Sequence, residues 1–198
     1  MPNATARNFL DAFLEAYSRC RLHYTREEWD LSVWPKWDYF LFRTKPHLGL
    51  RDESVLKAVA KKLDMDYWEG EPLRLDGVFH RKGGEVAHGF PFPILVAIEH
   101  EEAPHTFGSE IMKLLTVRCP LKVGITYDCG DAGWRKRIQD DIAEKFQAIA
   151  AVNSEDPHCE YLFLIGCFEN REAREPAWWS VQFSAGSGLN GTTFEPVQ

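Results

Sequence analysis

The 198-residue chain predicts an α/β (α+β) protein in which a mixed central β-sheet is flanked by helices. Three observations favour this class. Short apolar runs typical of buried strands recur at 93–100, 121–127 and 161–166. Segments with apolar residues at helical spacing separate these runs, and a strand–helix–strand order favours parallel pairing with a right-handed crossover. Because the sequence contains no internal repeat and no linker-like segment, we expect a single domain over 1–198.

The first part of the chain, 1–52, is expected to be a helical addition to a core that begins near residue 53. Apolar residues at helical spacing predict an amphipathic helix over 3–20. The aromatic segment 37–42 favours a strand. Asp52 or Ser54 is expected to cap a second helix, which has an apolar side that begins at Val55.

The core, about 53–150, is expected to combine a hairpin with a crossover unit. A strand over 72–80 and a connecting loop over 81–89, with its Gly-Gly pair, lead to the apolar strand 93–100. A helix over 106–117 then joins that strand to the strand 121–127. The second and third of these strands are therefore expected to pair in parallel.

The remaining elements extend the sheet. A long helix is predicted over 133–152, followed by strands over 161–166 and 178–183. The C-terminal part, 151–198, is thus expected to consist of strands and a Gly/Ser-rich tail that frays.

Composition excludes several classes of protein. The chain has 23 basic and 30 acidic side chains, a net charge of −7, which argues against a protein that coats nucleic acid but permits an enzyme with a local basic groove. No apolar run approaches the ~20 residues of a membrane span, and the N-terminus lacks a signal-peptide pattern, so a cytoplasmic location is expected. The five cysteines form no CxxC pair, which favours buried thiols over a zinc knuckle or a disulfide framework.

The strand 93–100 leads into two carboxylates, Glu99 and Glu101. Side chains alternate along a strand, so these two point the same way, roughly 7 Å apart. Two like charges at the end of a buried strand require a cation or a proton. Asp76 lies on the neighbouring predicted strand, and Gly77 beside it leaves room for a ligand. Asp76, Glu99 and Glu101 therefore predict an oxygen-only site for Mg²⁺ or Mn²⁺, and a water acidified by such an ion can attack a phosphodiester.

The helix 106–117 carries Glu110 and Lys113 at a spacing of three residues. Lys113 is placed to reach the predicted site, where it would stabilise negative charge on a phosphate or position the attacking water. The alternative is an ordinary exposed Glu–Lys pair on a helix, which contributes about 0.3 kcal/mol.

This pattern resembles the PD-(D/E)xK nuclease superfamily, which has a restriction-endonuclease-like fold. The resemblance covers roughly 53–127 and depends on Asp76-Gly77, on Glu99-His100-Glu101, and on the helix and strand that follow. It implies that Asp76 and Glu99 bind Mg²⁺. The family has a lysine where this chain has Glu101. Some members of the family tolerate a glutamate there, and in others a lysine from the following helix substitutes, a role for which Lys113 is the candidate.

The resemblance also implies a nuclease that cleaves nucleic acid, with DNA the favoured substrate. It allows a homodimer, and no contact with a membrane is expected. A further family acid on a preceding helix would be Glu15 or Glu53. The alternative is a catalytically inactive protein of the nuclease fold that serves in binding or assembly.

Three other interpretations are weaker. Histidines flank the acids, so a zinc site is an alternative, but no HExxH motif occurs; the residues are His80, His88, His100 and His105. A Ser-His-Asp hydrolase lacks a GxSxG motif. The two glutamates could also mark a strand that simply emerges into solvent.

Overall fold

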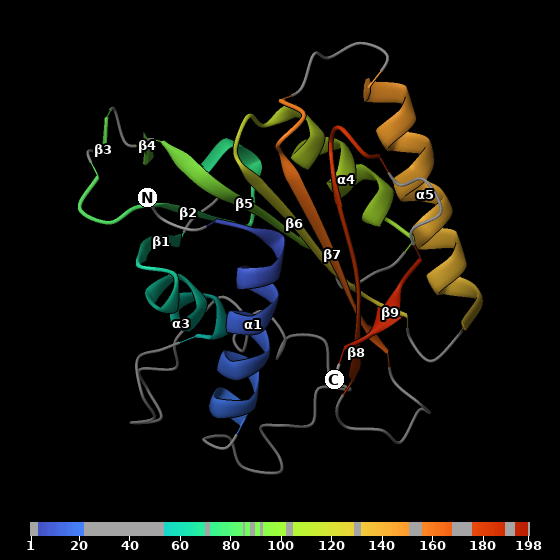
Figure 1. Cartoon of the computed structure of the whole chain (residues 1–198), viewed down its shortest axis with the longest axis horizontal. Coiled ribbons are helices and arrows are strands. Elements are labelled where there is room, and N and C mark those ends of the chain that lie inside the picture. Colours follow the sequence, from blue (N-terminus) through green and yellow to red (C-terminus); the bar gives the residue numbers. More distant parts are fainter. Residues whose placement is uncertain are drawn as a thin grey trace.

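The protein has a seven-stranded mixed sheet with helices on both faces, as the sequence predicts (Figure 1). The computed structural model describes residues 4–21, 54–69, 72–84, 86–87, 90–91, 93–101, 105–128, 132–150, 156–167, 176–188 and 193–197. The strands follow the order β1-β2-β5-β6-β7-β8-β9, and β5, β6 and β7 run parallel while the other neighbours are antiparallel. The predicted parallel crossover between β5 and β6 is thereby confirmed.

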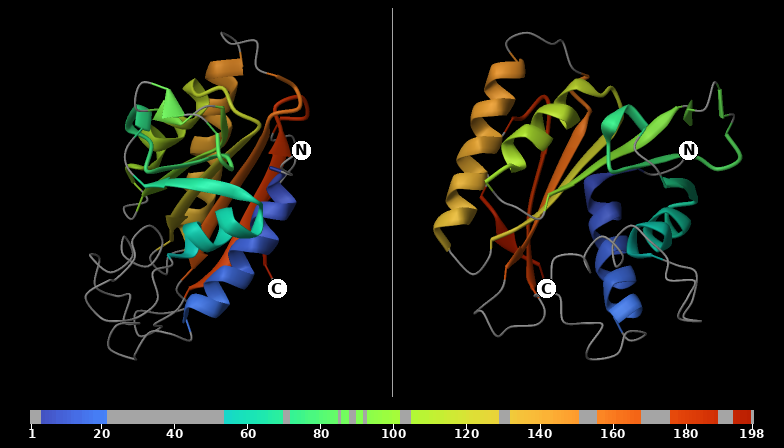
Figure 2. Two further views of the ribbon diagram at one scale, coloured as in Figure 1. Left: turned by 90° about the vertical axis from the view of Figure 1, so that its left-hand side faces the viewer. Right: turned by 180° about the vertical axis from the view of Figure 1, so that it is seen from behind.

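The strands of the large sheet are β1 (Met65–Glu69), β2 (Gly77–Arg81), β5 (Ile94–Glu101), β6 (Leu121–Tyr127), β7 (Glu160–Cys167), β8 (Ala177–Ser184) and β9 (Glu195–Pro196). A separate two-stranded ladder joins β3 (Val86–Ala87) to β4 (Phe90–Pro91). The described α-helices are α1 (Ala6–Arg21), α3 (Val55–Lys62), α4 (Phe107–Thr116) and α5 (Ala132–Ala150). Helices α1 and α3 cover one face of the sheet, and α4 and α5 cover the other (Figure 2).

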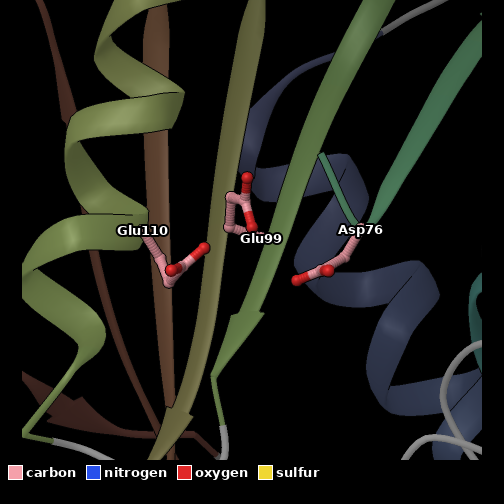
Figure 3. A group of neighbouring side chains, drawn as sticks. All are labelled: Asp76, Glu99 and Glu110. Carbon is pink, nitrogen blue, oxygen red and sulfur yellow. The ribbon is translucent and has the colours of Figure 1, made fainter. Parts of the chain in front are cut away.

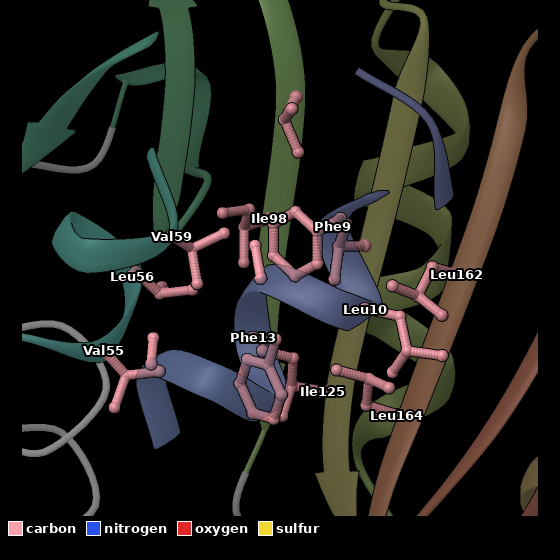
Figure 4. Close-up of a cluster of buried hydrophobic side chains, with 14 of the residues drawn as sticks. Phe9, Leu10, Phe13, Val55, Leu56, Val59, Ile98, Ile125, Leu162 and Leu164 are labelled. Atoms are coloured by element: carbon pink, nitrogen blue, oxygen red, sulfur yellow. The ribbon is translucent and has the colours of Figure 1, made fainter. Parts of the chain in front are cut away.

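The core beneath α1 and α3 is rich in aromatic and β-branched side chains (Figure 4). Phe9 stacks on Phe79 of β2 with ring centroids 5.7 Å apart, which fixes α1 across the sheet. Ser54 is the N-cap of α3, since its hydroxyl accepts a hydrogen bond from the Lys57 amide at 3.3 Å. Of the two predicted caps, Ser54 is therefore correct, and Asp52 lies outside the described residues.

The core beneath α4 and α5 places α4 close to β5 and β6. Gly124 of β6 makes this possible, because a Cβ there would lie 2.8 Å from the Phe107 ring and 2.6 Å from the Phe163 ring. Gly124 is also the register partner of Glu99 in β5. The ring of Phe107, at the start of α4, thus packs over the residue beside Glu99, and this contact sets the position of the rest of the helix.

The structure corrects the sequence prediction in several places. The predicted strand 72–80 begins only at Gly77, since Pro72–Arg74 forms a 3₁₀ turn, and β1 was not predicted. The end of the chain, expected to fray, includes β9, which pairs with β8. The predicted strand over 37–42 lies outside the described residues. None of the described helices is both long enough and apolar enough to cross a membrane.

Candidate metal centre

Three carboxylates converge on the face of the sheet that α4 covers (Figure 3). Asp76 lies in the bend before β2, Glu99 lies in β5, and Glu110 lies in α4. One oxygen from each lies within 4.8 Å of an oxygen from each of the others. Segments 34 residues apart in the sequence (110 minus 76) therefore supply a single ligand set.

Asp76 is held in place by the backbone of β5. Its Oδ2 accepts a hydrogen bond from the His100 amide at 2.8 Å. The antiparallel register explains this contact, because Gly77 pairs with Ile98 and the preceding residue then lies opposite the end of β5. Burial raises the pKa of Asp76, although the His100 amide opposes the rise.

Glu99 is fully buried, with 0% of its surface exposed, and neither of its carboxylate oxygens accepts a hydrogen bond. A buried carboxylate without a donor is costly when it is ionised. Burial therefore raises the pKa of Glu99 to about 10, and the adjacent charge of Asp76 and the Glu110 carboxylate add to the rise. In the metal-free protein at neutral pH, Glu99 carries a proton, which its neighbouring carboxylates can accept as a hydrogen bond.

Lys113 is the cation of this group. Its ammonium forms an ion pair with Glu110 one turn back on α4, and it lies 3.6 Å from Oε2 of Glu99. It also donates a long hydrogen bond, 3.5 Å, to the carbonyl of Arg74. Burial opposes the charged form of Lys113, but its contact with Glu110 and the nearby carboxylates outweigh burial and raise its pKa.

Glu110 is the carboxyl of the three with a lowered pKa. Burial favours its neutral form, but the hydrogen bond from Lys113 and the neighbouring Glu99 carboxyl outweigh burial and lower its pKa. The Ser109 hydroxyl adds a hydrogen bond of 3.3 Å. The site thus combines an ionised carboxylate at its edge with a protonated one in its interior.

The structure brings together three of the four predicted site residues. Asp76 and Glu99 meet as expected, and Lys113 reaches them. Glu101 is not part of the cluster: it is half-buried at the end of β5, about 7 Å further along the strand, where its backbone carbonyl accepts a hydrogen bond from the Thr126 hydroxyl at 2.7 Å. Glu110 takes the place that the sequence assigned to Glu101. The signal for Glu110 in the sequence is its spacing of three residues from Lys113, which places both on one face of the helix that covers Glu99.

The histidine alternative has no support in the described part of the chain. His100 points to the opposite face of the sheet, where its Nε2 lies 3.1 Å from the Tyr127 hydroxyl and burial lowers its pKa to about 3. The side chain of His80 is buried, and its Nδ1 lies 3.2 Å from the backbone carbonyl oxygen of Arg81, the next residue of β2. His105 is exposed, and His88 lies outside the described residues. The potential metal cluster found in that part of the chain contains carboxylates alone.

The two candidates for an additional acid have different outcomes. Glu15 forms an exposed ion pair with Lys62, which joins α1 to α3 on the face of the sheet away from the site. Glu53 lies outside the described residues. Glu110 supplies the third acid instead, from a helix that follows the two predicted ligands.

The residues at this site fit a hard divalent cation. Three carboxylates without nitrogen or sulfur are the donor set that Mg²⁺ and Mn²⁺ prefer. The two buried Glu99 oxygens lack hydrogen-bond donors, and a cation would satisfy both. Comparison with known proteins adds no assignment, since the chain matches no protein-family model, no curated protein and no solved structure.

Proposed function

We propose that this protein binds Mg²⁺ or Mn²⁺ through Asp76, Glu99 and Glu110 and hydrolyses phosphodiester bonds of nucleic acid, with DNA the favoured substrate. The observation that carries the proposal is the fully buried Glu99 carboxylate, which has two oxygens without hydrogen bonds and stands between two other carboxylates. A divalent cation provides the compensation that Glu99 needs when it loses its proton.

The order of elements around the site supports the proposed class. The acids lie at the start of β2 and near the end of β5, and α4 then crosses to the parallel strand β6. This arrangement is consistent with the resemblance to the PD-(D/E)xK nucleases, in which acids from two adjacent strands bind the ion. It extends that resemblance, because the third acid and the lysine both come from α4.

Each residue has a definable task in this reaction. When bound, the cation supplies Lewis acidity toward a phosphoryl oxygen and lowers the pKa of water. Asp76 is oriented for coordination by the His100 amide. Lys113 has 38% of its side chain exposed, so its ammonium can donate to a phosphate oxygen while it remains close to Glu99.

The direct test is cleavage of labelled duplex DNA, single-stranded DNA and RNA in Mg²⁺ or Mn²⁺. We expect cleavage by the wild type and its loss in Asp76→Asn, Glu99→Gln and Lys113→Met. The matched control is Asp140→Asn, which neutralises an exposed acid that pairs with Lys136 on α5. Absence of cleavage by the wild type on all three substrates would refute the enzymatic proposal, as would equal cleavage by the site variants.

A second candidate is a nuclease-fold protein that binds without cleaving. One observation favours it: the family's lysine position holds Glu101, and the ammonium of Lys113 is already paired with Glu110. Such a protein would bind the cation and nucleic acid with the same residues but would leave the substrate intact. Retention of labelled DNA without turnover, over a range of Mg²⁺ and Mn²⁺ concentrations, would select this candidate.

A further inference from the structure

We propose that Leu73 and Arg74 form a nucleic-acid contact beside the cation site, in which Arg74 neutralises a phosphate next to the scissile one and Leu73 packs against the adjoining sugar or base. This inference rests on the proposed function and adds the residues that recognise the substrate. Neither residue belongs to the cluster of carboxylates or contacts it through its side chain.

The two residues lie in the turn Pro72–Arg74, which one residue separates from Asp76. The turn is fixed at two points. The Arg74 carbonyl accepts the 3.5 Å hydrogen bond from Lys113, and the next residue, Leu75, is fully buried in the core beneath α4. Anything that binds at the cation site therefore lies close to this turn.

Leu73 is exposed where an apolar side chain has no structural role. Among the described residues, Leu73 is the one large hydrophobic residue that is exposed, with 53% of its surface accessible. Leu75, two positions later, has 0% of its surface accessible. A single exposed leucine is ordinary on a protein surface. Leu73 is, however, next to Arg74, which has a backbone carbonyl in contact with Lys113, and it lies three residues before Asp76, so it belongs to the turn beside the cation site. Apolar side chains in nucleic-acid-binding proteins pack against bases and sugars, and leucine is among those that insert between bases.

The backbone holds both side chains in a conformation that L-amino acids avoid. Leu73 has φ +58° and Arg74 has φ +65°, and the other non-glycine residue with positive φ in the described chain is Asp64, a type that tolerates it better. Glycine at either position would remove this cost. Strained backbone of this kind is typically kept at binding and active sites.

Arg74 provides an exposed positive charge next to the site. The chain as a whole carries −7, so a local cation is needed to attract a phosphate. Arg74 is exposed, and within the described part of the chain no ion pair holds its guanidinium. A guanidinium binds phosphate oxygens through two parallel hydrogen bonds, and successive phosphates of one DNA strand are spaced roughly 3.4 Å along the helix axis. An arginine two residues from a metal ligand is therefore suited to a neighbouring phosphate.

The test measures binding and cleavage separately. Binding of fluorescein-labelled duplex DNA, single-stranded DNA and RNA of one sequence is followed by anisotropy in Ca²⁺, and cleavage is followed in Mg²⁺. We expect Arg74→Ala to weaken binding several-fold and to reduce the slope of log Kd against log salt by ~0.7–0.9. Its KM should rise while kcat changes little, because the contact is the same in the bound and transition states.

Leu73→Gly is expected to weaken binding with no change in the salt slope. Its melting temperature should be equal to or above that of the wild type, since glycine favours φ +58°. A loss of binding therefore cannot arise from unfolding. The control is Arg7→Ala on α1, an exposed arginine on the opposite face of the sheet that pairs with Asp11; it should bind as the wild type does.

Weakened binding by both Arg74→Ala and Leu73→Gly supports the inference. The nucleic acid whose binding is weakened more, DNA or RNA, is then identified as the preferred substrate. If the wild type binds but never cleaves, and the variants bind less, the inference stands while the proposed hydrolysis fails. If the wild type cleaves and both variants bind and cleave equally well, the inference is overturned while the proposed function stands. Absence of binding to all three nucleic acids overturns both.

Discussion

Replacing Glu99 by glutamine should stabilise the metal-free protein, although it alters a buried residue of the candidate site. Glutamine resembles the protonated form of Glu99, and burial raises the pKa of that carboxyl from 4.5 to about 10. At pH 7 the folded protein therefore holds a proton that the unfolded chain has lost. This difference lowers the free energy of unfolding, because at pH 7 the carboxyl of the unfolded chain loses its proton readily, and that loss favours the unfolded state.

The magnitude follows from the two pKa values. Where the folded-state pKa exceeds the pH, the cost is 2.303RT times the distance of the pH from the unfolded pKa, or about 1.4 kcal/mol for each pH unit above ~4.5. At pH 7 this amounts to about 3 kcal/mol, and it requires only that the folded pKa lie above 7. Because the pKa of Glu99 is higher in the folded state than in the unfolded state, stability is highest below pH ~4.5 and falls as the pH rises toward 10.

The assay is urea unfolding of wild type and Glu99→Gln in EDTA at pH 4 and pH 7. We expect equal stabilities at pH 4 and an advantage of up to about 3 kcal/mol for the variant at pH 7. Millimolar Mg²⁺ should reverse the order at pH 7, since the wild type alone gains from the ion. The matched control is Glu144→Gln on α5, an exposed acid paired with Lys145, which should change stability by less than about 0.5 kcal/mol at both pH values.

The opposite result has a clear meaning. If Glu99→Gln is less stable than the wild type at pH 7 in EDTA, and the difference does not depend on pH, then Glu99 is ionised and compensated in the metal-free protein. The candidate site would then contain a permanent salt bridge with Lys113, and the case for a cation would be lost.

Three further predictions concern the same face of the sheet. Mg²⁺ affinity should rise about tenfold per pH unit between pH 5 and 8, because the ion displaces one proton; calorimetry in two buffers of different ionisation enthalpy would count that proton. Glu110→Gln should lower Mg²⁺ affinity by on the order of tenfold or more, and Glu101→Gln should lower it far less; equal losses by calorimetry would return Glu101 to the ligand set. In urea unfolding, Gly124→Ala should destabilise the fold by about 1–3 kcal/mol, because its Cβ would lie 2.6–2.8 Å from two aromatic rings. The control is Gly108→Ala, which should cost no stability because the nearest atom would be 3.8 Å from its Cβ.

The elements of the fold were predictable where apolar residues follow one period. The strands β5, β6 and β7 and the helices α1, α4 and α5 all have this property. β1 was missed because it has only five residues and because the adjacent Tyr67 and Trp68, which pack on opposite faces of the sheet, break the alternation that Met65 and Asp66 begin. The turn before β2 was missed because no sequence pattern indicates positive φ at a leucine and an arginine.

The site was predictable to the extent that it depends on strand neighbours. Asp76 and Glu99 come from paired strands, and a hairpin expectation is enough to place them together. The choice between Glu101 and Glu110 depends on the packing of α4 over Gly124, a three-dimensional contact that has no local signature. Spacing along a strand favoured Glu101, but the helix that covers the strand brings its own carboxylate closer.

The charges of the cluster explain why a proton and a cation are alternatives at this site. Three ionised carboxylates and the ammonium of Lys113 sum to −2, which one divalent cation neutralises. Without the ion, the same balance is approached by retaining protons, and the most buried carboxyl, Glu99, is the one that takes a proton first. Metal binding must therefore deprotonate Glu99. The energy that the protonated carboxyl costs the metal-free fold is recovered only when the ion is present. Between pH 5 and 8 the stability of the ion-bound state should therefore stay level, because the tenfold gain in affinity per pH unit offsets the loss of the metal-free state.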